Sequence, residues 1–158
     1  PILHGGAQEK GMRSSTENVH AILGMEKALA ISCASMKEDK KYIESLKSYF
    51  IKQLKNHFID IQFNGLSGCL EKSSYTIVNV RFNVKDKMLL FNLDLQGIAV
   101  SGGSACQSGA SKGSHVLMTF LSEQEAVKTS VRFSFSKLTT VDELNFCIEK
   151  LKSNKSLK

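Results

Sequence analysis

The chain has 158 residues, of which 42% are hydrophobic and 23% are charged, and it carries a net charge of +6. This size and composition are ordinary for a soluble globular protein with one core. No run of about 18 apolar residues occurs, so we expect no membrane partner. The lysines are dispersed and no exposed aromatic residues interleave with them, so we expect no nucleic-acid partner either.

The four cysteines lie far apart in the sequence, at Cys33, Cys69, Cys106 and Cys147. None belongs to a CxxC pair, and no pair of histidines lies near any of them. This spacing excludes the common zinc-site patterns and gives no disulfide framework. We therefore expect no metal site, and a reducing, cytoplasmic compartment.

The first 18 residues are rich in glycine and polar side chains. They resemble neither a signal peptide nor a natural N-terminus, so we expect a piece of a longer chain. Ser14 and Glu17 have the spacing of a capping box, which predicts that a helix begins near Thr16. The hydroxyl groups here either cap that helix or, with its free backbone amides, bind an anion.

Helical periodicity runs from Val19 to Leu29 and returns between Tyr42 and Leu54. The second period either continues the first helix or begins a new one near Ser35. Further along, alternation and β-branched residues predict strands, and apolar spacing predicts a helix that Gly97 ends. In chain order we expect a strand over 59–63, a turn at Asn64 and Gly65, a strand over 75–82, a helix over 87–95 and a short buried strand over 97–100.

Residues 101–115 contain no large apolar side chain, and Cys106 lies among them. Glycine and serine bury little apolar surface, so this composition predicts an exposed, mobile loop. A free cysteine is usually buried, which makes a thiol on such a loop unusual. The residues alone leave open whether Cys106 is functional or an incidental surface thiol.

After the loop we expect a short helix from Ser114 and a capped helix at Ser122. Residues 130–136 alternate so that Val131, Phe133 and Phe135 share one face and Arg132 lies on the other. A final helix should begin at Thr140. Apolar spacing assigns both Cys147 and Cys33 to the core. The order of elements predicts an α+β fold, a mainly antiparallel sheet with helices packed on one face.

Four sequence blocks together resemble the C-terminal part of the cysteine desulfurases, which are pyridoxal-phosphate enzymes of the class V aminotransferase type. The blocks are GGAQE at 5–9 with RSSTEN at 13–18, GIAVSGGSAC at 97–106, SHVL at 114–117, and VRFS at 131–134 with Thr139, Thr140 and Glu143. The long loop with its SAC sequence resembles the subgroup that serves iron–sulfur cluster assembly. The blocks span nearly the whole chain.

The resemblance implies that residues 1–18 are the tail of the large cofactor-binding domain. Residues 19–158 would then be the C-terminal small domain of a fold-type I enzyme, with the catalytic-cysteine loop at 101–115. It further implies that L-cysteine is converted to L-alanine and that Cys106 is the catalytic nucleophile that becomes a persulfide. Arg132 corresponds to the residue that binds the substrate carboxylate. Thr16 corresponds to a residue that contacts the cofactor phosphate of the partner subunit, which implies a homodimer. A scaffold or carrier protein would accept the sulfur.

The chain departs from the family pattern at Ser15 and Gly102, where glycine and serine are usual, and also at 113 and 136–137. No part of it matches the motif of the lysine that forms the Schiff base with pyridoxal 5'-phosphate. We therefore expect the 158 residues alone neither to bind the cofactor stably nor to turn over. Three alternatives stay open: a selenocysteine lyase, another class V aminotransferase relative, and a stand-alone persulfide-carrier module.

Overall fold

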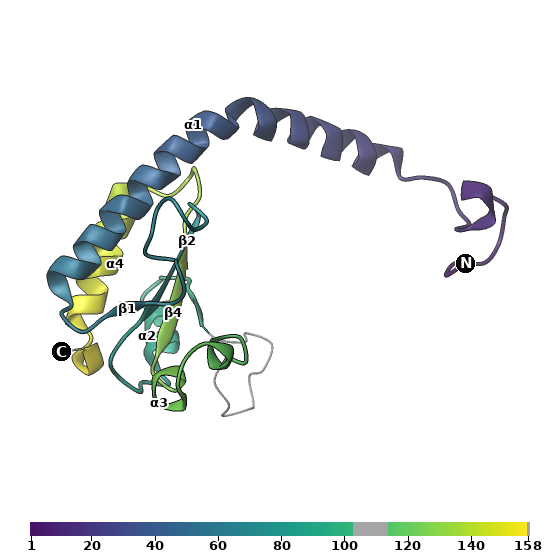
Figure 1. Ribbon diagram of the computed structural model, residues 1–158. Helices are drawn as coiled ribbons and strands as arrows, with labels where there is room; N and C mark the ends of the chain where they lie inside the picture. Colours follow the sequence, from purple (N-terminus) through teal and green to yellow (C-terminus); the bar gives the residue numbers. More distant parts are fainter. Residues whose placement is uncertain (103–113, 158) are drawn as a thin grey trace. The chain divides into compact units, whose positions relative to one another are not determined.

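The computed structural model describes residues 1–102 and 114–157 (Figure 1). The expected catalytic-cysteine loop therefore lies largely outside the described residues. Contacts divide the chain into two units, Pro1–Lys37 and Glu38–Lys158, which we describe separately.

The first unit holds a short 3-10 helix, η1 (Glu9–Gly11), and the beginning of α1 (Val19–His57). The sequence predicted a helix start near Thr16, which is wrong. Asn18 is the cap, because its Oδ1 accepts from the backbone N–H of Ala21 at 3.0 Å. Ser15 has a φ of 82°, which lies in the left-handed region that favours glycine.

The two helical periods of the sequence belong to one unbroken helix, α1. Its first-unit part leaves several apolar side chains exposed, among them Val19, Leu23 and Leu29. Cys33 is exposed as well, so its assignment to the core is wrong for the described residues. By length and composition α1 could cross a membrane. A single such helix is weak support for a membrane span, because core helices of soluble proteins have the same properties.

Among the described residues, the second unit is built on a four-stranded sheet in which every pair of neighbouring strands is antiparallel. The strand order is β1-β2-β4-β3. The strands are β1 (Gln62–Phe63), β2 (Ile77–Arg81), β3 (Ser101–Gly102) and β4 (Ser130–Ser134). This sheet confirms the α+β prediction. Residues 97–100 are not a buried strand, contrary to the prediction. They lead into β3, which pairs with β4 and forms one edge of the sheet.

Helices cover the apolar face of the sheet. Residues Val78, Val80 and Val131 are fully buried there against side chains from α1, α2 (Leu89–Leu95) and α4 (Val141–Ser153). The Phe50 ring of α1 contacts the edges of Phe133 and Phe135, with ring centroids 4.9 and 5.6 Å apart. Burial of these large side chains is the main source of stability for the unit.

The last helix has the start that the sequence predicts. Thr140 and Glu143 form a reciprocal capping box at the N-terminus of α4. Cys147 is buried in its apolar stripe, which confirms that assignment. Tyr49 of α1 donates to Asn145 Oδ1 at 2.5 Å, so α1 and α4 lie side by side.

The connection from β3 to β4 contains η2 (Leu117–Thr119) and α3 (Glu123–Ala126), and η3 (Lys155–Leu157) follows α4. Ser122 caps α3 as expected, accepting from the N–H of Glu125.

Lys47 is a fully buried cation that the sequence gives no reason to expect. Its ammonium donates to Ser73 Oγ and to the carbonyl of Ser74, each at 2.7 Å. Desolvation lowers the pKa of Lys47. These two hydrogen bonds attach the loop before β2 to α1.

Candidate functional site

The polar face of the sheet carries two neighbouring cross-strand pairs. Asn79 of β2 is in register with Arg132 of β4, and Arg81 is in register with Ser130. Side chains in such positions lie close enough to share one ligand. Arg132 therefore lies on the polar face, as the alternation predicts, while Val131 and Phe133 beside it are buried.

A pocket of about 210 Å³ opens at these residues. Its polar wall includes Asn79, Ser130 and Arg132. Ser101 and Gly102, which precede the undescribed stretch, and Ser114, which follows it, line the same pocket. The chain therefore enters and leaves that stretch at the pocket that contains Arg132.

The Arg132 guanidinium makes no hydrogen bond or ion pair within residues 1–102 and 114–157. A guanidinium presents a planar set of donors that fits a carboxylate in a bidentate way. An arginine without a partner in the described part of the chain, on the wall of a small polar pocket, is thus suited to bind a carboxylate ligand.

Behind the pocket lies a hydrogen-bond network that no sequence motif predicted. Glu125 Oε2 accepts from Arg81 Nε at 2.9 Å, and Arg81 also donates from a terminal nitrogen to Asn64 Oδ1. Asn64 Nδ2 then donates to Asn79 Oδ1 and Ser130 Oγ, each at 3.0 Å. The hydrogen bond from Lys128, followed by the charges of Lys128 and Arg81, lowers the pKa of Glu125.

The network left one signal in the sequence. Asn79 and Arg81 alternate with Val78 and Val80, which places both polar side chains on the same face as Arg132 once β2 and β4 are paired. The contribution of Asn64 had no such signal, because it depends on a turn that returns to the sheet.

The three expected site residues are not all in this pocket. Arg132 is. Cys106 lies outside the described residues, and Thr16 belongs to the first unit, where it is exposed just before α1. The Thr16 hydroxyl makes no hydrogen bond among the described residues, so it fits one contact with a phosphate. One hydroxyl does not hold a cofactor, and the described residues contain no group of potential metal ligands.

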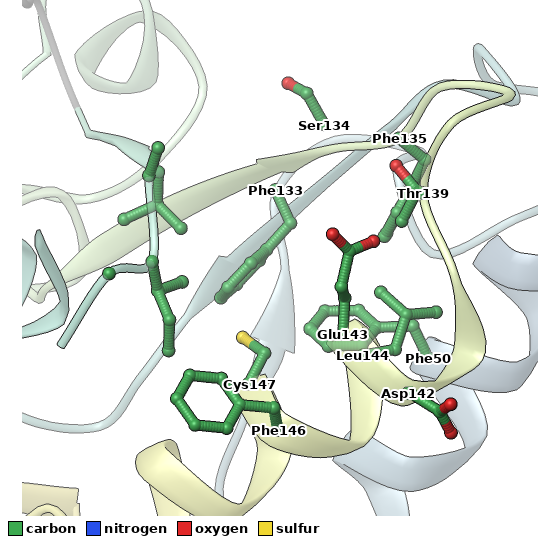
Figure 2. Close-up of a pocket in the computed structure, with 14 residues that line it drawn as sticks. Phe50, Phe133, Ser134, Phe135, Thr139, Asp142, Glu143, Leu144, Phe146 and Cys147 are labelled. Atoms are coloured by element: carbon green, nitrogen blue, oxygen red, sulfur yellow. The ribbon is translucent and has the colours of Figure 1, made fainter.

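A larger pocket of about 430 Å³ lies on the opposite, apolar side of the sheet, next to α4 (Figure 2). Phe50, Phe133 and Leu144 form much of its wall, and the sulfur of Cys147 lies beside them. Its acidic residues are Asp142 and Glu143, and Glu143 already caps α4. Among the described residues no cation lines this pocket, whereas Arg132 lines the smaller one, so we regard the smaller pocket as the candidate functional site.

Residues 4–146 match the aminotransferase class-V family, and the chain belongs to that family. It is similar to curated proteins named cysteine desulfurase IscS. The protein from Dictyoglomus turgidum is 34% identical over 154 residues, which cover 96% of this chain and 38% of that protein. The one from Cronobacter sakazakii is 37% identical over 147 residues, 93% of this chain and 35% of that protein. The chain thus spans a little over a third of the length of these relatives.

Solved structures agree with the sequence comparison. A NifS-like protein superposes with a TM-score of 0.74 at 29% identity, covering 96% of this chain and 37% of its own. The X-ray structure of a NifS-like protein from Rickettsia africae gives the same TM-score and identity and covers 39% of its own chain. The α+β arrangement is therefore the one found in NifS-like proteins.

Proposed function

We propose that a full-length protein containing this chain is a cysteine desulfurase that converts L-cysteine to L-alanine and forms a persulfide on Cys106. The observation that carries the proposal is the guanidinium of Arg132, which has no partner among the described residues and lies in a pocket that Gly102 and Ser114 also line. Similarity to desulfurases over more than nine-tenths of the chain supports the choice of substrate.

In this proposal Arg132 binds the carboxylate of L-cysteine and orients the amino acid. Gly102, four residues before Cys106, lines the same pocket, and a chain of four residues spans at most about 14 Å. The pocket is therefore within reach of the Cys106 thiolate. Pyridoxal phosphate, held by groups beyond this chain and by Thr16 of the partner subunit, would act as the electron sink.

The chemical step uses the thiolate as nucleophile. Cys106 Sγ attacks the sulfur of the substrate, a sulfur–sulfur bond forms, and the carbon–sulfur bond breaks. The electron pair of the broken bond goes to the substrate carbon, which takes up a proton. The products are alanine and a persulfide on Cys106, and a scaffold or carrier protein for iron–sulfur assembly would then accept the outer sulfur. We also propose a homodimer in the cytoplasm.

The test is an assay of the full-length protein with L-cysteine and a reductant, in which sulfide and alanine are both measured. We expect Cys106→Ser to lower sulfide release at least about a hundredfold, because a hydroxyl is a far weaker nucleophile than a thiolate. Cys69→Ser is the matched control and should keep the parent rate. A Cys106→Ser protein with the parent rate would overturn the proposal and favour a lyase or a transaminase; a preference for selenocysteine would favour the selenocysteine lyase.

A further inference from the structure

Asn79 faces the same pocket as Arg132, and the direction of its amide group is fixed by its neighbours. The chain of bonds begins at Arg81, which is only 8% exposed and whose guanidinium has hydrogen-bond donors and no acceptor. The Asn64 atom that it contacts must therefore be the amide oxygen. The chemistry of the guanidinium therefore fixes the orientation of the Asn64 amide.

The orientation passes from Asn64 to two residues of the pocket. With its oxygen facing Arg81, Asn64 presents its NH₂ group to Asn79 and Ser130, at 3.0 Å from each. A donor must meet an acceptor, so Asn79 turns its Oδ1 toward Asn64. Its Nδ2 is left pointing away from the network and makes no hydrogen bond among the described residues.

Ser130 is oriented in the same way. Its oxygen accepts from Asn64, which leaves its hydroxyl hydrogen free to donate. The pocket thus gathers donors from three side chains on one face of the sheet, Asn79, Ser130 and Arg132. Three donors on one wall suit an anion, and a volume of about 210 Å³ leaves room for a small molecule that carries a carboxylate.

We propose that Asn79 is a second carboxylate-binding residue, which donates from Nδ2 to the carboxylate that Arg132 binds, and that the Glu125–Arg81–Asn64 network fixes the direction of its amide. The inference rests on the proposed function for the role of Arg132. It adds a specificity-determining residue and three residues that position it.

The experiment uses the full-length protein with its cofactor and measures binding by calorimetry. The probes are 3-mercaptopropionate, which carries a carboxylate, and 3-mercaptopropanol, its neutral counterpart. We expect Asn79→Leu to weaken the binding of 3-mercaptopropionate about tenfold, because one hydrogen bond to a charged group is lost. The affinity for 3-mercaptopropanol should stay unchanged. Ser130→Ala should weaken 3-mercaptopropionate less, about threefold.

The direction of the amide has its own test in Asn64→Asp. A carboxylate at 64 still pairs with Arg81 but cannot donate, so Asn79 must turn its NH₂ toward it and its oxygen toward the pocket. We expect this variant to weaken the binding of 3-mercaptopropionate at least as much as Asn79→Leu does. In the Asn79→Leu background the same change should have no further effect, because it acts through the Asn79 amide.

Several outcomes overturn the inference. Equal weakening of both probes in Asn79→Leu would indicate a change of pocket shape, and additive losses in the double variant would indicate a through-space charge effect. Unchanged binding in Asn79→Leu together with loss in Arg132→Gln would leave Arg132 as the carboxylate ligand without Asn79. Unchanged binding in both would remove the carboxylate role of Arg132 as well. The sulfide assay of Cys106→Ser is independent of all four results.

Discussion

On β4, buried and exposed residues alternate, so that one strand supplies side chains both to the core and to the pocket. Val131 and Phe133 are buried in the core, and Arg132 between them is directed to the pocket on the other face. The period of two in a strand makes this separation unavoidable, so it could be predicted from the sequence. It also means that a shift of one residue in register would bury the guanidinium.

Cys147 supplies a prediction at the same scale. Desolvation in the core raises the pKa of the Cys147 thiol to about 12. The folded protein keeps this proton at a pH where the unfolded chain has lost it, so the folded state binds more protons. The contribution of Cys147 to the free energy of unfolding is fully present below the ordinary thiol pKa. The free energy of unfolding then falls as the pH rises toward the pKa of the folded state.

We therefore expect Cys147→Ala to be less stable than the parent at pH 8, by about 1 to 2 kcal/mol for the lost packing, and the difference to shrink by pH 10.5. Denaturant unfolding of the full-length protein, followed by circular dichroism, measures both. Ile148→Val is the control, since it alters the same helix without a titratable group and its effect should not vary with pH. A difference that stays constant for Cys147→Ala would contradict the expectation.

At the scale of elements, the short strand β3 is shaped by its contact with α2. A Cβ built on Gly102 would lie 2.5 Å from Leu90 Cδ2, closer than side chains approach. Its backbone is not left-handed, so a side chain at 102 is disfavoured by the space that Leu90 occupies and not by conformation. The packing of Leu90 thus favours glycine at 102, where the sequence pattern that the chain resembles has serine.

We expect Gly102→Ala to cost about 1 kcal/mol of stability through displacement of the Leu90 side chain, because the clashing atom is the end of a flexible side chain. The unfolding midpoint of the full-length protein measures this cost. In a Leu90→Ala background the same change should have no cost, since the clash partner is gone. An equal cost in both backgrounds would place the effect in the backbone.

At the scale of the whole molecule, the first-unit part of α1 presents an apolar face without cover among the described residues. Leu23 and Leu29 are 60% and 63% exposed there, and Cys33 is exposed too. These side chains recur at helical spacing, although none of them is buried among the described residues. Because the chain spans only 38% of the length of the relative from Dictyoglomus turgidum, we infer that the remainder of a longer protein covers this face.

Thiol labelling tests that inference. We expect Cys33 to react with iodoacetamide at least about tenfold more slowly in the full-length protein than in the 158-residue chain, because burial excludes the reagent. Cys69, which is half-buried in the second unit, should react alike in both and serves as the control. Equal rates for Cys33 would mean that the face stays open in the longer protein.

The sequence by itself determined which side chains share a face, because the periods of helix and strand are local properties of the backbone. The alternation around Arg132, the stripe that buries Cys147 and the capping box of α4 follow from this. Tertiary structure alone decided the fit of Gly102 against Leu90 and the network from Glu125 to Asn79. Each depends on contacts between residues distant in sequence, such as Asn64 and Ser130. Local periodicity carries no information about such tertiary contacts.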